Sequence, residues 1–142
     1  MNADILLIED SHEDAELVTR IIKSTHPTTT VKIINDGAAA LDFLIEAGAS
    51  GSNAMLPKVV FLDIKLPKLT GLQILGKLRE SGFSRTIPVV MMTSSNQQSD
   101  IEECYRLGAN SYLVKPIEFP ALQKMVVNST KYWLNFNRTC SC

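Results

Sequence analysis

The sequence has little net charge and no long apolar run. A formal net charge of −1 over 142 residues gives no general attraction to nucleic acid or to anionic membranes. No apolar run approaches the roughly 18 residues that a membrane-spanning helix requires. The first ten residues, MNADILLIED, lack the basic start and the small-residue cleavage site of a signal peptide. We therefore expect a cytoplasmic protein without a membrane segment and without direct contact with nucleic acid.

Cysteine is also scarce, and its three positions are Cys104, Cys140 and Cys142. Cys104 falls in a segment of helical pattern, where we expect a small buried side chain. Cys140 and Cys142 form the sequence CSC, which offers too few ligands at too tight a spacing for a structural zinc site. We predict reduced cysteines without a metal role and interpret residues 137–142 as a short tail.

What the sequence does contain is the composition of a folded globular domain. Apolar residues make up 45% of the chain and charged residues 20%. The length suits one domain of ordinary size. Because there is no second block of composition and no internal repeat, we predict a single domain over residues 1–136 with no output domain attached.

Five short apolar runs divide this domain. They occupy residues 4–10, 31–35, 58–64, 87–94 and 111–116. Continuous apolar runs of this length are typical of strands buried on both faces of a parallel sheet. Segments with helical period follow them, at residues 13–25, 37–47, 70–80, 97–107 and 117–136. The alternation predicts an α/β protein with a doubly wound, five-stranded parallel sheet.

Local signals support the helix boundaries. Asp36 and Thr70 precede two of the helical segments and are expected to cap their amino ends. Gly108 in the sequence RLGAN is expected to end a helix in the left-handed conformation. Residues 46–57, EAGASGSNAMLP, are small and polar, so we predict a loop with a mobile tip.

Polar residues gather where the predicted strands end. The first strand ends in Glu9 and Asp10, the third in Asp63, the fourth in Thr93 and Ser94, and the fifth in Lys115 and Pro116. In an open parallel sheet, sites form outside the carboxyl ends of the strands. Three converging carboxylates repel one another, and a hard divalent cation such as Mg²⁺, which prefers oxygen ligands, relieves that repulsion.

These residue types predict a specific chemistry. A carboxylate oxygen left free by the cation can act as a nucleophile. Lys115 supplies a positive charge for Asp63 or for a phosphoryl oxygen, and Thr93 supplies a hydroxyl donor. Together these groups are the components of phosphoryl transfer to an aspartate, in which the protein provides positioning and charge neutralisation.

The order and spacing of these motifs resemble the receiver domain of two-component response regulators. The resemblance covers residues 4 to about 130. It is carried by IED at 8–10, LDIKLPKLTG at 62–71, MMTS at 91–94 and GANSYLVKP at 108–116. It implies a flavodoxin-like (βα)5 fold with strand order 2-1-3-4-5.

The resemblance also implies roles for the acidic residues and for Lys65. Glu9 and Asp10 resemble the acidic pair that holds Mg²⁺, with Mn²⁺ as an alternative ion. Asp63 resembles the phosphoryl acceptor, which is also a metal ligand. Lys65 stands where the family uses a backbone carbonyl as a further ligand.

Three further positions carry implied roles. Thr93 resembles the hydroxyl residue that turns toward the phosphoryl group, and Tyr112 the aromatic residue whose rotamer changes with it. Lys115 resembles the family's active-site lysine, and its peptide bond to Pro116 is expected to be cis. The implied function is that of a signalling protein, not of an enzyme, apart from self-phosphorylation and self-dephosphorylation at Asp63.

The absence of an output domain and the long final helix with KYWL at 131–134 narrow the resemblance. These features resemble the small single-domain regulators that partner bacterial phytochrome histidine kinases. The implied donor is therefore a histidine kinase, in a two-component system or phosphorelay. We expect output through protein association, including a homodimer through the face formed by residues 97–107, 111–114 and 117–134.

Three other classes of protein fit less well. A haloacid-dehalogenase-type phosphatase needs a second aspartate where this chain has Lys65. A flavodoxin-like flavin binder needs a phosphate-cradling loop after the first strand, where the acidic sequence EDSHED would repel phosphate. A phosphate-independent receiver that serves only as a binding module remains the main alternative.

For the remaining polar and aromatic residues we mainly predict surface or structural positions. His12 and Asp14 are expected at the exposed start of a helix, and His26 is expected to face solvent in a loop. Tyr132 and Trp133 either close the core or contribute to a dimer or kinase contact.

Overall fold

The computed structural model describes residues 3–49, 56–80 and 83–139, and its centre is a parallel sheet. The strands are β1 (Ile5–Ile8), β2 (Val31–Ile34), β3 (Val59–Leu62), β4 (Val89–Thr93) and β5 (Ser111–Val114). All neighbouring strands pair in parallel, in the order β2-β1-β3-β4-β5. The predicted fold class and strand order are therefore confirmed.

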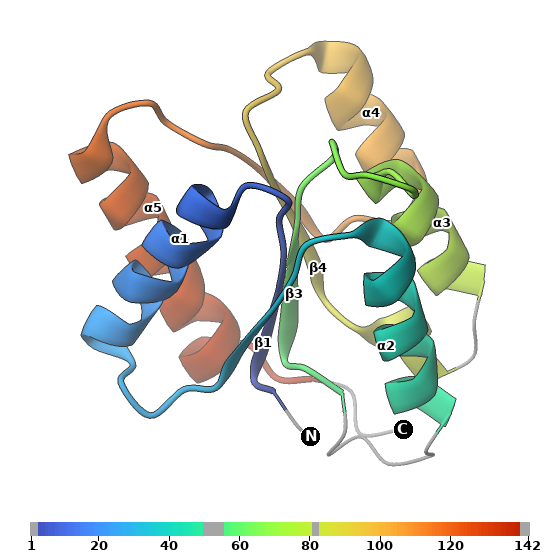
Figure 1. The fold of residues 1–142 in the computed structure, drawn as a ribbon, viewed down its shortest axis with the longest axis horizontal. Coiled ribbons are helices and arrows are strands. Elements are labelled where there is room, and N and C mark those ends of the chain that lie inside the picture. Colours follow the sequence, from blue (N-terminus) through green and yellow to red (C-terminus); the bar gives the residue numbers. More distant parts are fainter. Residues whose placement is uncertain (1–2, 50–55, 81–82, 140–142) are drawn as a thin grey trace.

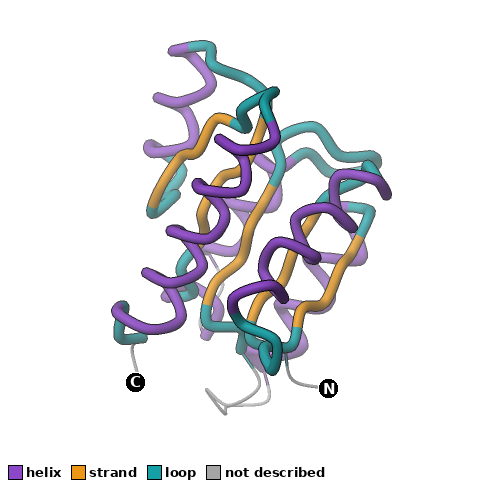
Figure 2. The backbone as a smooth tube through the Cα atoms, turned by 90° about the vertical axis from the view of Figure 1, so that its left-hand side faces the viewer, coloured by secondary structure: helices purple, strands orange, loops and turns teal. Residues whose placement is uncertain are grey.

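Helices cover both faces of this sheet. They are α1 (His12–Thr25), α2 (Gly37–Ala49), α3 (Gly71–Glu80), α4 (Gln98–Arg106) and α5 (Phe119–Lys131), with a short 3-10 helix η2 (Phe83–Thr86) and a π-helical turn η3 (Tyr132–Phe136). Helices α1 and α5 pack on one side, and α2, α3 and α4 on the other (Figure 1). In Figure 2, α1 and α5 face the viewer and the strands run behind them. None of the helices in the described ranges is long and apolar enough to span a membrane.

The core follows from the apolar runs. Every residue of β1, β3 and β4 is buried, whereas the edge strands β2 and β5 are partly exposed. The α1/α5 side of the sheet packs around Phe61, Ile22 and Val126, and the other side around Leu44, Leu75 and Cys104. Cys104 is fully buried, as predicted, and burial raises the pKa of its thiol to about 11.

The predicted helix boundaries are largely confirmed. The Asp36 carboxylate accepts a hydrogen bond from the Ala39 N–H at 2.8 Å. Thr70 and Gln73 form a reciprocal pair, in which each side-chain oxygen accepts from the other residue's backbone N–H. Gly108 follows α4 with φ of +104°, in the left-handed region.

Two predictions of local structure were wrong. Residues 46–49 are helical rather than part of a loop, because α2 continues to Ala49 and buries Ala47 and Gly48. Burial outweighs the cost of about 1 kcal/mol that a helical glycine carries. The predicted tip of that loop lies outside the described residues.

The Lys115–Pro116 bond is trans, since the described residues contain no cis peptide bond. Trans is the intrinsically favoured isomer by about 0.5–1 kcal/mol, and the sequence pattern itself imposes no cis bond.

The outcomes for the remaining residues are mixed. His12 is exposed as predicted and lies 3.5 Å from Glu16. His26 is half-buried, contrary to prediction, because its ring nitrogens contact Thr25 Oγ1 at 2.9 Å and Asn135 Oδ1 at 2.8 Å. Trp133 packs against the α1/α5 core, whereas its edge-on neighbour Tyr132 is half exposed. Residues Cys140 and Cys142 lie outside the described ranges.

Candidate functional site

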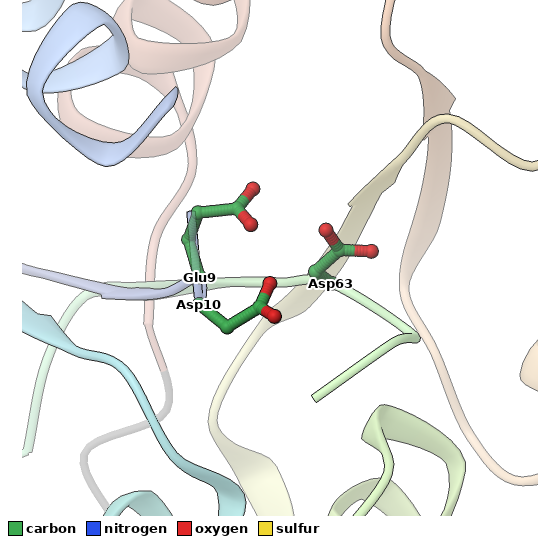
Figure 3. Close-up of side chains that lie close together, drawn as sticks. All are labelled: Glu9, Asp10 and Asp63. Carbon is green, nitrogen blue, oxygen red and sulfur yellow. The ribbon is translucent and has the colours of Figure 1, made fainter. Parts of the chain in front are cut away.

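Three carboxylates converge at the carboxyl end of the sheet. Ile8 pairs with Leu62, so the residues that follow β1 and β3 leave the sheet side by side. The Asp63 N–H donates to the Ile8 carbonyl at 3.1 Å, which extends this pairing by one residue. Glu9, Asp10 and Asp63 each present a carboxylate oxygen, and these three oxygens lie within 4.8 Å of one another (Figure 3). The predicted convergence of the acids is confirmed.

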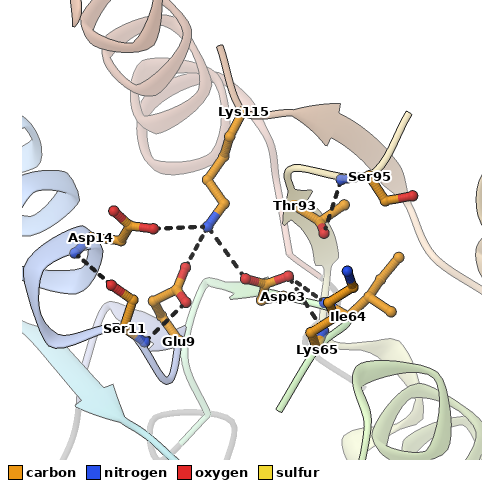
Figure 4. Close-up of polar contacts among 9 residues, drawn as sticks. All are labelled: Glu9, Ser11, Asp14, Asp63, Ile64, Lys65, Thr93, Ser95 and Lys115. Atoms are coloured by element: carbon orange, nitrogen blue, oxygen red, sulfur yellow. Dashed lines mark hydrogen bonds and ion pairs between the residues drawn. The ribbon is translucent and has the colours of Figure 1, made fainter. Parts of the chain in front are cut away.

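Lys115 reaches the same point from the end of β5. Its ammonium donates to Glu9 Oε1 at 2.5 Å and to Asp63 Oδ2 at 3.3 Å (Figure 4). A third carboxylate, that of Asp14, lies 3.7 Å away. The Lys115 side chain is only 13% exposed, so these partners replace water around the charge.

Burial and neighbouring charges shift the pKa values of Glu9 and Lys115. Burial raises the pKa of Glu9, and the hydrogen bond and charge of Lys115 offset only part of that rise. Burial by itself lowers the pKa of Lys115, but the hydrogen bond to Glu9 and the charge of Asp63 outweigh it and raise the pKa above its usual value. The Lys115 ammonium therefore stays charged at neutral pH.

Asp63 presents its two oxygens differently. Oδ1 accepts from the Ile64 N–H at 2.7 Å and lies 3.5 Å from the Lys65 N. Oδ2 faces the Lys115 ammonium. The start of α3 packs against this turn, because a Cβ on Gly71 would lie 2.2 Å from the Asp63 carbonyl oxygen. The backbone thus orients the carboxylate and leaves one oxygen for chemistry.

Thr93 and Tyr112 are linked through the loop that follows β4. Thr93 is buried, and its Oγ1 lies 3.5 Å from the Ser95 N. The Tyr112 hydroxyl donates to the Ser95 carbonyl at 2.9 Å. The Ser95 hydroxyl in turn donates to Asp100 Oδ2 at 2.5 Å, which ties the loop to α4.

The acidic cluster opens into a cavity of about 500 Å³. Beyond the charged residues, α1, α5 and the segment between β5 and α5 supply an apolar wall, formed by Leu17, Val18, Pro116, Ile117 and Leu122. Ile117 is fully exposed at this wall. Ser94 and Lys65 also line the cavity, and the Lys65 side chain is exposed.

Sequence reasoning missed two contributors from the start of α1. The Ser11 N–H donates to Glu9 Oε2 at 3.2 Å, and its hydroxyl caps α1 by accepting from the Asp14 N–H at 3.3 Å. Asp14 is exposed as predicted, but it also contacts Lys115. The available signal was its place in the first turn of α1, directly after the acidic end of β1.

The carboxylate set fits a hard divalent cation. All three candidate ligands offer oxygen, and the excess negative charge favours an ion such as Mg²⁺ or Mn²⁺. The cluster lines the cavity, in which such an ion can retain water and substrate oxygens.

The sequence pattern of the response regulator receiver domain family matches residues 5–127. The chain belongs to this family. It is therefore a response regulator receiver of two-component signalling. Two curated relatives match nearly the whole receiver. The probable methanogenesis regulatory protein FilR2 of Methanothrix harundinacea is 38% identical over 95% of this chain and 86% of its own length. Response regulator Rcp1 of Synechocystis is 35% identical over 92% of this chain and 88% of its own.

Solved structures of response regulators, one of them a phytochrome response regulator, share the fold of this receiver. The phosphorylated cyanobacterial phytochrome response regulator RcpA superposes with a TM-score of 0.88 at 28% identity, covering 99% of this chain and all of its own. The Mn²⁺-bound form of Rcp1 superposes with a TM-score of 0.82 at 34% identity, covering 97% of this chain and 99% of its own. This receiver is therefore close to phytochrome response regulators.

Proposed function

We propose that this receiver accepts a phosphoryl group on Asp63 from a histidine kinase and signals by changing its association with other proteins. The observation that carries the proposal is the Lys115 ammonium, which lies between Glu9 and Asp63 in a cluster of three carboxylates. A buried cation held this way costs desolvation, and a role in stabilising a transferred phosphoryl group accounts for it.

Asp63 Oδ2 is the proposed nucleophile, since Oδ1 is held by backbone N–H groups. An O–P bond forms at Oδ2 as the P–N bond of the donor phosphohistidine breaks, and the electron pair leaves with the imidazole. Lys115 then moves its hydrogen bond from the Asp63 carboxylate to a phosphoryl oxygen. The buried Thr93 hydroxyl lies at the end of the neighbouring strand and is the proposed donor to a second phosphoryl oxygen.

Glu9, Asp10, Asp63 and the Lys65 backbone carbonyl are the proposed ligands of Mg²⁺ or Mn²⁺. When bound, the ion supplies neutralisation of the charge that accumulates during transfer. The oxygen-only donor set and the Mn²⁺-bound form of the relative Rcp1 support this assignment.

Thr93 and Tyr112 are the proposed route from the site to a surface. Movement of Thr93 toward a phosphoryl group would alter the loop at Ser95, to which Tyr112 is bonded. Tyr105, Val114 and Phe119 expose between 39% and 50% of their surface on or beside α4, β5 and α5. We propose this face as the homodimer or effector contact, with output through association rather than DNA binding.

The proposed donor is a histidine kinase of the phytochrome class, supported by the similarity to the phytochrome response regulator RcpA. The apolar wall beside the acids is the proposed kinase contact, since Ile117 is fully exposed there. We predict that Ile117→Ser slows transfer from a phosphorylated kinase about tenfold, because a buried apolar contact is lost. Transfer from a small phosphodonor should stay unchanged, and equal loss with both donors would contradict the contact.

The direct test is phosphoryl uptake. The protein is incubated with Mg²⁺ and acetyl phosphate, and its intact mass is measured. Wild type should gain one labile phosphoryl group, Asp63→Asn should gain none, and the exposed control Asp42→Asn should behave as wild type. If wild type gains nothing, the phosphate-independent binding module is the better description.

A further inference from the structure

Asp14 holds a negative charge at the mouth of the proposed acceptor site without belonging to the carboxylate cluster. Its Oδ2 lies 3.7 Å from the Lys115 ammonium, and its side chain is 54% exposed. Figure 4 places Asp14 and Asp63 on opposite sides of that ammonium. Among the described residues, the acids close enough to share a cation are Glu9, Asp10 and Asp63 only.

With a divalent cation bound, its two positive charges and that of Lys115 would match three ionised carboxylates at Glu9, Asp10 and Asp63. Asp14 would be a fourth acidic group beyond that balance, and it lines the same cavity as Asp63. Two like charges about 4 Å apart repel by about 1 kcal/mol even in water, so an anionic donor bound beside Asp14 would be repelled.

We propose that Asp14 is a specificity-determining residue that selects phosphoryl donors by charge and disfavours dianionic small molecules. The inference rests on the proposed function of Asp63. Asp14 repels a dianionic donor as it enters, and it also draws the Lys115 ammonium away from the incoming phosphoryl oxygens. A donor with one negative charge fewer experiences about half of this repulsion.

Acetyl phosphate and phosphoramidate differ in net charge but transfer a phosphoryl group to the same aspartate. With acetyl phosphate, the Asp63 O–P bond forms as the bond from phosphorus to the acetate oxygen breaks, and the electron pair leaves with acetate. With phosphoramidate, a monoanion at neutral pH, the P–N bond breaks and the pair leaves with nitrogen as ammonia. Both reactions use the same nucleophile, so their ratio reports on donor charge.

The experiment measures both rate constants in Mg²⁺ buffer for wild type, Asp14→Asn, Asp14→Glu and Glu13→Gln. Glu13 is the matched control, because it is an exposed acid of the same helix turn that lines neither the cavity nor the Lys115 contact. Asp14→Asn should raise the acetyl phosphate rate about threefold to tenfold and the phosphoramidate rate by a smaller factor. Asp14→Glu and Glu13→Gln should keep the wild-type ratio, and added salt should narrow the difference.

An unchanged donor ratio in Asp14→Asn, with active wild type, would overturn the role of Asp14 alone. A fall in both rates for Asp14→Asn would also overturn it, by showing that Asp14 serves to position Lys115. Failure of wild type to react with either donor would instead overturn the proposed function, and this inference with it.

Discussion

Two partly buried cations lie at opposite ends of β5 and are held in different ways. Lys115 follows the carboxyl end of the strand, and its partners are the carboxylates of Glu9, Asp63 and Asp14. Arg79, on α3, lies against the segment that precedes the amino end of β5. Its partners are the neutral carbonyl groups of residues 85, 87 and 108 and the side-chain amide of Asn110.

The Lys115 charge can change its hydrogen-bond partners, whereas the Arg79 charge is fixed in place. An ammonium is a compact charge that can exchange one oxygen for another, whereas the planar guanidinium fork fixes the direction of every hydrogen bond. Burial lowers the pKa of Arg79, but it stays protonated, with distances of 2.7–2.9 Å to its four acceptors. Asn110 Oδ1 also accepts from the Val89 N–H, so Arg79 joins α3 to the starts of β4 and β5. We infer that Lys115 serves function and Arg79 serves stability.

The largest expected effect follows from removing the movable charge. Lys115→Gln should slow phosphoryl uptake from acetyl phosphate about a hundredfold, because a charge that stabilises the transferred group is lost. Intact mass against time measures the rate. The control is Lys124→Gln, at an exposed position on α5. A wild-type rate in Lys115→Gln would contradict a role of Lys115 in phosphoryl transfer.

Removing the fixed charge should act on folding instead. Arg79→Met leaves several carbonyl groups without a donor and should lower the free energy of unfolding by about 2–4 kcal/mol. Denaturant unfolding measures it, with the exposed Arg20→Met as control. The phosphoryl uptake rate of the folded variant should remain that of wild type; a parallel loss would show that the two ends are coupled.

Gly108→Ala tests the fit around Arg79. A Cβ there would lie 2.8 Å from Arg79 Cγ, in a backbone with φ of +104°. We expect a loss of about 1–2 kcal/mol in unfolding free energy. The contrasting variant is Gly76→Ala within α3, where the nearest atom to a Cβ is 3.7 Å away, so stability should rise by about 0.5–1 kcal/mol. Equal effects at both glycines would argue against a tight fit at Arg79.

The smallest effect concerns pH. Since the folded pKa of Lys115 lies above its usual 10.5, its charge stabilises the fold at lower pH. That contribution is lost as the pH rises through the folded pKa. Metal-free wild type should therefore lose more unfolding free energy above about pH 10.5 than Lys115→Gln does. Parallel stability curves for the two proteins would contradict a stabilising pair at Lys115.

Several parts of the site could be predicted because they depend on local pattern. The apolar runs placed the strands, and polar residues directly after them had to emerge at one edge. The Asp36 and Thr70 caps and the left-handed Gly108 also followed from neighbouring residues. Asp14 was classed only as an exposed helix-start acid, because its contact with Lys115 spans most of the chain.

The sequence by itself determined the fold class, the helix caps and the set of acids beside one lysine, since these depend on burial period and on residue type at strand ends. Only the tertiary structure decided the partners of Arg79 and the position of Asp14. These depend on distances between segments that are remote in sequence, and side-chain packing sets such distances once the sheet and its helices have assembled.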